Sequence, residues 1–229
     1  MFFKDKSEKN INKKISYSQC GEDLIIDFIF VTLKIDKPSY LDIGAHHPWY
    51  LSNSAFFYLK QCKGVTVEPD PSLFEVIKKE RPADISLNVG VGLESGESAD
   101  FYIMNIPTLN TFSKTEAERY AAYPGKEIKK VVKLPLLTVN EIIQKQFQGK
   151  TPNFVSIDVE GMDLEIVSSF DFNKYRPEVF CIETLTYTEN NSERKITEII
   201  DYMLKQGYFL YADTYINSVF VDEKAWKNR

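Results

Sequence analysis

Cysteine and histidine are scarce in this chain, which has three cysteines and two histidines among 229 residues. Cys20, Cys62 and Cys181 lie far apart and form no CxxC pair, and their odd number does not suggest a disulfide framework. We expect all three to be small buried side chains in a protein of the reducing cytoplasm.

Long apolar runs and an excess of basic charge are also absent. The longest apolar run, Leu24–Leu33, contains Asp27 and is too short to span a membrane. The first fourteen residues hold no apolar core of signal-peptide length. The net charge is −5 without any basic block, so we expect neither nucleic acid nor a membrane surface as a partner. A homo-oligomer remains open.

Short apolar segments that fit strands alternate with segments of about ten residues that fit helices. The expected strands are Ser39–Gly44, Gly64–Glu68, Ile85–Val91, Ala99–Met104, Val131–Leu136, Asn153–Val159, Glu178–Glu183, Tyr208–Ala212 and Ser218–Val221. The expected helices begin at Gly21 and cover Ser54–Lys60, Pro71–Lys79, Val139–Phe147, Leu164–Phe170 and Glu193–Lys205. This order predicts an α/β fold with a mostly parallel, doubly wound sheet, closed by an antiparallel hairpin.

No repeat or low-complexity linker divides the chain, so we expect one domain from residue 16 to residue 229. Residues 1–15 are polar and are predicted to be a flexible tail. The least regular stretch, residues 105–130, is predicted to be an insertion that binds a substrate, because loops above such a sheet carry specificity.

Acidic residues follow four of the five expected parallel strands, namely Asp42, Glu68, Asp158 and Glu183. The remaining strand is followed by an asparagine and glycines. Ligands of open α/β sheets bind at the carboxyl ends of the strands. We therefore expect these acids to share one pocket.

The loop after the first strand has one glycine, Gly44, where a dinucleotide fingerprint has three. Asp42 before this turn would repel a pyrophosphate, but it suits a cationic amine or ring hydroxyls. Glu68, after the next strand, stands where an acid accepts both hydroxyls of a ribose. A ribose with an amino-acid tail and no phosphate describes S-adenosylmethionine (SAM) better than NAD.

These residues belong to an ordered set of motifs that resembles the FkbM-type, SAM-dependent methyltransferases. The resemblance runs from about Ser16 to Glu183. Its parts are Ser18–Asp23, Tyr40–Ala45, Leu51–Ser54, Val67–Pro69, Asn88–Gly92, Leu137–Thr138 and Ile157–Gly161. It implies the seven-stranded class I methyltransferase fold, Rossmann-like and with an antiparallel last strand.

The resemblance also implies where the cofactor lies. Asp42 and Gly44 would be near its methionine part, Glu68 at its ribose and residues 88–91 near its adenine. An N-terminal segment would fold over it. The cofactor contacts expected from the motifs are Gln19, Glu22, Asp23, Asp42, Gly44, Ala45, Asn53, Glu68, Pro69, Asn88, Val89, Gly90, Val91 and Asp158.

The sequence departs from the family pattern at His46 and His47, where many relatives have Asn-Asp or Asn-Val. A hydroxyl acceptor needs a base, and histidine titrates near neutral pH. We expect the base to be His47 or His46, with Asp158 or Glu160 orienting or replacing it. The alternative is that His46 caps the next helix or packs under the cofactor.

Asp158, Glu160 and Glu183 could instead hold Mg²⁺, which binds carboxylates and can acidify a hydroxyl. Metal is not the favoured interpretation. The expected acceptor contacts are Thr108, Asn110, Thr111, Arg119, Tyr120, Tyr123 and Glu183. Residues 114–120 also fit an ordinary solvated helix.

The sequence is therefore interpreted as a SAM-dependent O-methyltransferase. The family resemblance, and no single residue, suggests a carbohydrate acceptor such as a nucleotide-activated sugar, for example a heptose, or a surface polysaccharide. The alternatives are a methyltransferase for polyketide-like molecules, and a module that binds cofactor without turnover.

Overall fold

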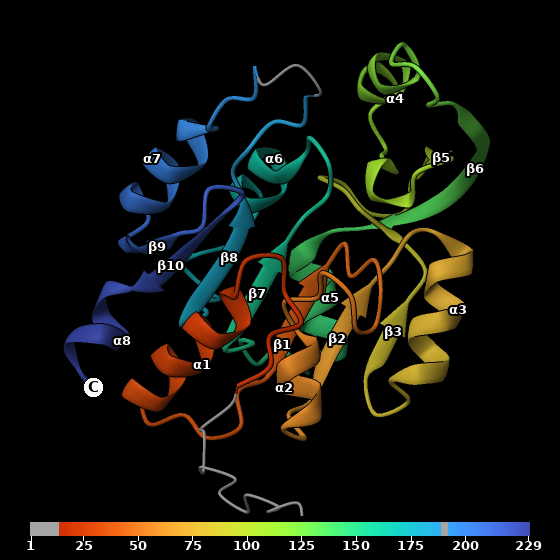
Figure 1. Cartoon of the computed structure of the whole chain (residues 1–229). Coiled ribbons are helices and arrows are strands. Elements are labelled where there is room, and N and C mark those ends of the chain that lie inside the picture. Colours follow the sequence, from red (N-terminus) through yellow and green to blue (C-terminus); the bar gives the residue numbers. More distant parts are fainter. Residues whose placement is uncertain (1–13, 189–191) are drawn as a thin grey trace, which may run out of the picture.

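The computed structural model describes residues 14–188 and 192–229. A seven-stranded sheet with the strand order β3-β2-β1-β7-β8-β10-β9 forms its centre (Figure 1). The strands are β1 (Tyr40–Ile43), β2 (Gly64–Val67), β3 (Ile85–Leu87), β7 (Phe154–Ile157), β8 (Val179–Glu183), β9 (Tyr208–Asp213) and β10 (Asn217–Asp222).

The pairing confirms the predicted fold class. The four pairs formed by β3, β2, β1, β7 and β8 are all parallel. β10 runs antiparallel to both of its neighbours, β8 and β9. The strand order reverses between β1 and β7, and this is the switch point at which open α/β sheets bind ligands.

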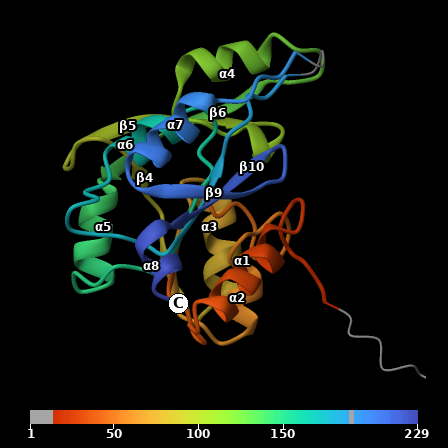
Figure 2. The ribbon, with the colours of Figure 1, turned by 90° about the vertical axis from the view of Figure 1, so that its left-hand side faces the viewer.

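Both faces of the sheet are buried, which explains why its strands lack a polar face. Leu41 and Ile43 of β1 pack into one core cluster with the helices α5 (Val139–Gln146), α6 (Asp163–Ser168) and α7 (Thr197–Lys205). Tyr40 points to the opposite cluster, which includes α1 (Glu22–Thr32) and α2 (Ala55–Leu59). In the turned view α5 lies on one side and α1 and α2 on the other (Figure 2).

Two helices beside the sheet have well-formed N-terminal caps. The Asp70 side chain accepts hydrogen bonds from the first turn of α3 (Pro71–Glu80). Thr138 and Glu141 form a capping box at the start of α5. Such caps satisfy backbone N–H groups that a helix leaves free, and they fix where each helix leaves the preceding strand or loop.

A second, three-stranded sheet has the order β4-β6-β5 and differs from the expectation for residues 85–91. This segment is not one strand: β3 ends at Leu87, and β4 (Gly90–Val91) pairs with β6 (Ile128–Leu137) instead. The Asn88 amide donates to the carbonyls of Glu68 and Pro69, which ties the chain to the β2 loop where it changes sheets.

The remainder of the second sheet carries the predicted insertion. β5 (Ser98–Met104) pairs antiparallel with β6, and the chain between them forms the short 3-10 helix η1 (Pro107–Leu109) and α4 (Lys114–Ala121). Figure 1 shows α4 above the main sheet. Ala117 and Tyr120 of α4 are buried against this sheet, so the helix is not fully solvated.

Other sequence predictions need correction. The helix expected over Glu193–Lys205 begins at Thr197, because the backbone of Arg194 is held by Thr186 and that of Ile196 by Thr184. Cys20 is exposed, whereas Cys62 and Cys181 are buried as expected. The expected tail lies outside the described residues except for residues 14 and 15. Within the described part, no helix is long and apolar enough to cross a membrane.

Candidate active site

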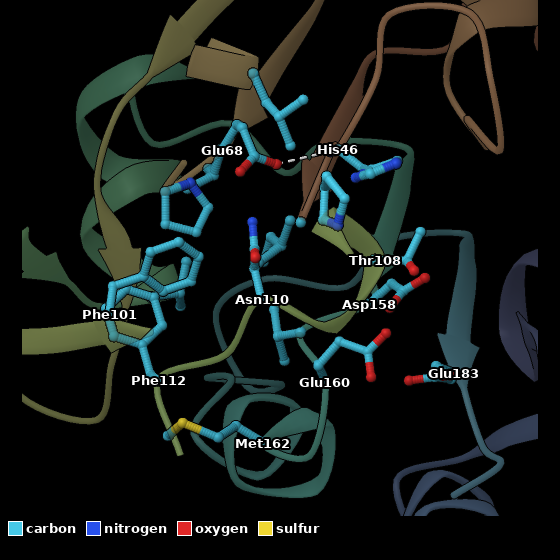
Figure 3. Close-up of a pocket in the computed structure, with 18 of the residues that line it drawn as sticks. His46, Glu68, Phe101, Thr108, Asn110, Phe112, Asp158, Glu160, Met162 and Glu183 are labelled. Carbon is cyan, nitrogen blue, oxygen red and sulfur yellow. Dashed lines mark hydrogen bonds between the residues drawn. The ribbon is translucent and has the colours of Figure 1, made fainter. Parts of the chain in front are cut away.

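A cleft opens at the carboxyl ends of β1, β2 and β7, over the switch point. The empty space within it, including solvent at its open mouth, is about 940 Å³. Its lining comprises Gln19, Ile43, Gly44, His46, Leu51, Val67, Glu68, Pro69, Leu73, Val89, Val91, Phe101, Pro107, Thr108, Asn110, Phe112, Asp158, Val159, Glu160, Met162, Ile166 and Glu183. Figure 3 shows Glu68 at one end and Glu160 with Glu183 at the other.

Glu68 is held rigidly at the end of β2. Its Oε2 accepts the backbone N–H of His46 and its Oε1 accepts that of Asp70, both at 2.7 Å. Burial nevertheless raises the pKa of Glu68 to about 8, although these two hydrogen bonds favour the ionised form. The side chain keeps acceptor capacity toward the cleft, as recognition of two ribose hydroxyls requires.

Gly44 lets the loop after β1 pass close to β7. Its φ is +82°, and a Cβ atom at this position would lie 1.7 Å from the carbonyl oxygen of Asp158. Any side chain would therefore clash with backbone and strain the turn. The N–H groups of Gly44 and Ala45 both donate to the Val67 carbonyl, so this turn is packed against β2.

The cleft has an apolar wall near Glu68, and sequence reasoning missed half of it. Val89 and Val91, which were expected, are joined by Phe101 and Phe112, whose ring centroids lie 4.7 Å apart. Flat apolar surface of this kind suits a heteroaromatic ring such as adenine. Phe101 comes from β5 of the second sheet, so only long-range strand pairing brings it here.

The opposite end of the cleft is acidic. One carboxylate oxygen from each of Asp158, Glu160 and Glu183 lies within 4.8 Å of the others. Burial and the neighbouring carboxylates raise the pKa of Asp158 to about 6 and those of Glu160 and Glu183 well above the ordinary glutamate range. This group can attract a cationic ligand, accept a proton or hold a divalent metal ion.

Asp42 is not part of the cleft lining. Ser54 donates to its carboxylate, and Ser54 in turn accepts a hydrogen bond of 2.9 Å from Arg81. Asn53, another expected cofactor contact, donates to Ser156 at 3.1 Å. Both side chains are buried.

The expected N-terminal segment reaches the cleft only through Gln19. Glu22 accepts hydrogen bonds from Thr214 and Asn217 at 2.6 and 3.0 Å, which joins α1 to the last hairpin. Asp23 accepts the N–H of Tyr17 at 2.7 Å and thereby holds the segment before α1. Neither carboxylate lines the cleft.

The two histidines differ in position. His46 lines the cleft with a left-handed backbone, and burial lowers its pKa, so its imidazole is neutral at pH 7. His47 does not line the cleft. Its Nδ1 accepts the N–H groups of Trp49 and Tyr50, each at 3.1 Å, so it holds the turn that follows.

The remaining expected cofactor residues fall into two groups. Pro69, Val89 and Val91 line the cleft, while Ala45, Asn88 and Gly90 do not. Gly90 lies behind the apolar wall, since a Cβ there would be 2.4 Å from the Phe112 ring.

The expected acceptor residues are divided as well. Thr108 and Asn110 line the cleft, and the Asn110 amide donates to the Asp70 carboxylate at 3.0 Å. Thr111 donates to the backbone carbonyl of Glu160 at 3.0 Å. Arg119, Tyr120 and Glu183 line an adjoining cavity, and Tyr123 lines neither.

The donor set of the cleft fits SAM. The Glu68 carboxylate at the β2 end matches a ribose, and the apolar wall beside it matches an adenine. The group of carboxylates opposite matches the positively charged sulfonium and amine. Topology and cleft together define a class I, Rossmann-like methyltransferase.

Comparison with known families makes this assignment specific. The model of the methyltransferase FkbM domain matches residues 42–210, so the chain belongs to the FkbM methyltransferase family and is a SAM-dependent methyltransferase. Comparison with curated proteins gives no significant match.

Several solved structures are similar over most of the chain. A TehB-like SAM-dependent methyltransferase from Corynebacterium glutamicum is 10% identical, with 89% of this chain and 88% of that chain covered and a TM-score of 0.46. A putative caffeoyl-CoA O-methyltransferase from Staphylococcus aureus is 10% identical, with 92% and 85% covered and a TM-score of 0.48. An O-methyltransferase from Bacillus cereus in complex with S-adenosylhomocysteine (SAH) is 9% identical, with 90% and 80% covered and a TM-score of 0.44.

Proposed function

We propose that this methyltransferase acts on a hydroxyl group of a carbohydrate, either a nucleotide-activated sugar such as a heptose or a surface polysaccharide. The observation that carries the proposal is the carboxylate group of Asp158, Glu160 and Glu183 at one end of the cofactor cleft. Carboxylates bind sugar hydroxyls by accepting their hydrogen bonds, and one of them can take the proton of the reacting hydroxyl.

The residues of the cleft have separate tasks in this proposal. Glu68 accepts the ribose hydroxyls, and Val89, Val91, Phe101 and Phe112 cover the adenine. SAM, when bound, supplies a methyl group on a sulfonium, which is already a good leaving group. The chain must therefore align the acceptor oxygen, exclude water and remove one proton.

The proton acceptor is proposed to be Glu160 or Glu183, with His46 as the alternative. Both carboxylates face the acid end of the cleft, and the raised pKa values of Glu160 and Glu183 make them stronger bases than ordinary carboxylates. His46 lies in the loop beside Glu68, at the ribose end. His47 is set aside because its Nδ1 is already occupied by two backbone N–H groups.

A methyl-transfer assay with labelled SAM and a panel of acceptors tests the function. The panel contains nucleoside diphosphate sugars, surface polysaccharide and polyketide-like hydroxylated compounds. Methyl incorporation into a sugar, located by mass spectrometry, supports the proposal. Transfer to the polyketide-like compounds alone would favour that alternative acceptor class. SAH binding without transfer to any compound would favour a non-catalytic cofactor module.

The same assay tests whether magnesium takes part. We expect transfer to continue after dialysis against EDTA, because the sulfonium needs no Lewis acid and Tyr120 already donates to Glu160. Recovery of the rate only after Mg²⁺ is added would instead assign the three carboxylates to a metal. We also propose the cytoplasmic location that the sequence suggests.

A further inference from the structure

A second cavity adjoins the cofactor cleft, and its empty space, including solvent at its open mouth, is about 1000 Å³. Its walls come from α4, from the loop after β7 and from the chain that follows β8. The lining comprises Glu116, Arg119, Tyr120, Glu160, Gly161, Asp163, Glu183, Leu185, Thr186, Tyr187, Thr188, Ser192, Arg194 and Ile196. Glu160 and Glu183 line both hollows, so the two meet at these carboxylates.

The walls of this cavity are tied to one another. Arg119 of α4 forms an ion pair with Glu116 and donates from Nη1 to the carbonyl of Tyr187 at 2.9 Å. Tyr120 donates to Glu160 at 3.3 Å. A Cβ atom at Gly161, where φ is +97°, would lie 3.3 Å from the Glu116 side chain. The cavity is therefore a built feature of the insertion and the β7 and β8 loops.

Its charges are unevenly placed. Glu160 and Glu183 lie toward the cofactor cleft, and Asp163 lines this cavity beside them. Burial, with the charge of Asp158, raises the pKa of Asp163 to about 7. The charge of Arg119 is balanced by Glu116. Arg194 is exposed, and its guanidinium forms no ion pair with any residue that the structure describes. The inner wall thus repels anions, and the outer rim offers a free cation.

We propose that this second cavity is the acceptor site and that it takes a phosphorylated sugar, with the sugar ring at Glu160 and Glu183 and the phosphate at Arg194. The inference rests on the proposed carbohydrate function. Hydroxyls of an uncharged ring donate to carboxylates, whereas a phosphate placed there would meet three acids. A planar guanidinium at the rim suits phosphate oxygens.

Titration calorimetry of the full chain saturated with SAH tests the site. The probes are GDP-mannose and UDP-glucose as nucleoside diphosphate sugars, mannose 1-phosphate as a sugar phosphate, and methyl mannoside without phosphate. We expect at least one phosphorylated probe to bind more tightly than methyl mannoside. The difference between the nucleotide sugars and mannose 1-phosphate then identifies the source of the phosphate. No binding of any phosphorylated probe at millimolar concentration would overturn the proposal.

Two variants locate the binding. Arg194→Gln should raise the dissociation constant of the phosphorylated probe by about tenfold, as expected for a lost charge-assisted contact. Thr188→Trp should fill the cavity and abolish binding. The matched controls are Arg229→Gln, at the chain end, and Ser168→Trp, on the exposed end of α6. All four should keep the wild-type affinity for SAH, which shows that they fold. Unchanged probe affinity in both test variants would overturn the proposal.

The labelled-methyl assay separates failure of this site from failure of the proposed function. If a carbohydrate is methylated equally by wild type, Arg194→Gln and Thr188→Trp, the function stands and the proposed site is wrong. If phosphorylated sugars bind in an Arg194-dependent way but none accepts a methyl group, the site stands and the carbohydrate methyltransferase proposal is wrong.

Discussion

Arg81 and Asp84 form an ion pair in which neither side chain is exposed to solvent, with 2.6 Å between Nη2 and Oδ2. The same guanidinium donates to the hydroxyls of Tyr40 at 3.1 Å and Ser54 at 2.9 Å. The Ser54 hydroxyl donates in turn to the Asp42 carboxylate, so Arg81 is the cation for two buried carboxylates, Asp84 directly and Asp42 through Ser54. Burial raises the pKa of Asp42, and the charge of Arg81 opposes that rise.

Removal of this cation should destabilise the fold. Arg81→Met should lower the free energy of unfolding by about 3–5 kcal/mol, because the Asp84 carboxylate would stay buried without its cation and would keep only neutral donors such as the Tyr40 hydroxyl. Urea denaturation followed by circular dichroism measures this loss. Arg229→Met, at the exposed chain end, is the control and should change stability little. A loss below about 1 kcal/mol for Arg81→Met would show that the charges are compensated in another way.

The role of Glu68 can be tested through cofactor affinity. At a pH above about 8, where the Glu68 carboxyl is ionised, Glu68→Gln should raise the dissociation constant for SAH by about ten- to a hundredfold. Hydrogen bonds to a charged acceptor contribute about 1.5–3 kcal/mol. Calorimetric titration measures the affinity. Glu75→Gln, on the exposed side of α3, is the matched control. Equal affinities of the two variants would remove Glu68 from the cofactor site.

The raised pKa of Glu68 predicts a pH dependence of cofactor binding. With a pKa of about 8, the carboxyl is mostly protonated at neutral pH, and ribose hydroxyls donate best to its ionised form. Binding therefore releases a proton, and affinity should increase by up to about tenfold per pH unit until about pH 8 and then level off.

Adenosine is the suitable ligand for this measurement, because it carries the ribose but no amino-acid tail that titrates. Titrations in buffers of different ionisation enthalpy report the released proton directly. The Glu68→Gln variant should show a flat profile. Affinity that falls as the pH rises would contradict the assignment.

Much of the main sheet was predictable because its strands carry their own pattern. The apolar runs at residues 64–67 and 154–157 are buried on both faces, and Pro69 and Pro71 follow closely after the first of them. The acids that follow β2 and β7 reach the cleft because parallel strands end at the same edge. Local sequence was sufficient for these features.

Contacts between residues of different sheets could not be predicted from the local sequence pattern. Phe101 reaches the apolar wall of the cleft because β6 pairs with both β4 and β5. Phe112 reaches it because the preceding residue, Thr111, forms a β-bridge with Tyr102 of β5. The placement of Asp42 was predictable in principle. It alternates with Leu41 and Ile43, so a strand period of two directs it to the opposite face, toward Ser54.

The two histidines should respond differently to substitution. His47→Asn keeps an acceptor near the N–H groups of Trp49 and Tyr50, so it should retain SAH binding and most methyl transfer. His46→Gln changes a side chain in the cleft, and it should weaken SAH binding by a few-fold without abolishing transfer. Loss of transfer by more than about a hundredfold in either variant, with intact SAH binding, would make that histidine the base.

Substitutions at the acid end of the cleft should lower methyl transfer much more than they weaken SAH binding. Glu183→Gln removes a proton acceptor that lies outside the ribose and adenine contacts. Asp158 and Glu160 remain at the acid end to face the cofactor amine, so SAH affinity should fall by at most a few-fold. The turnover of the methylated acceptor should fall by about a hundredfold or more. Glu165→Gln, on the exposed face of α6, keeps the same change of charge away from both cavities and should transfer methyl groups normally. If Glu183→Gln turns over at the wild-type rate and Glu160→Gln does not, Glu160 is the base. Normal turnover in both would leave His46 as the remaining candidate in the cleft.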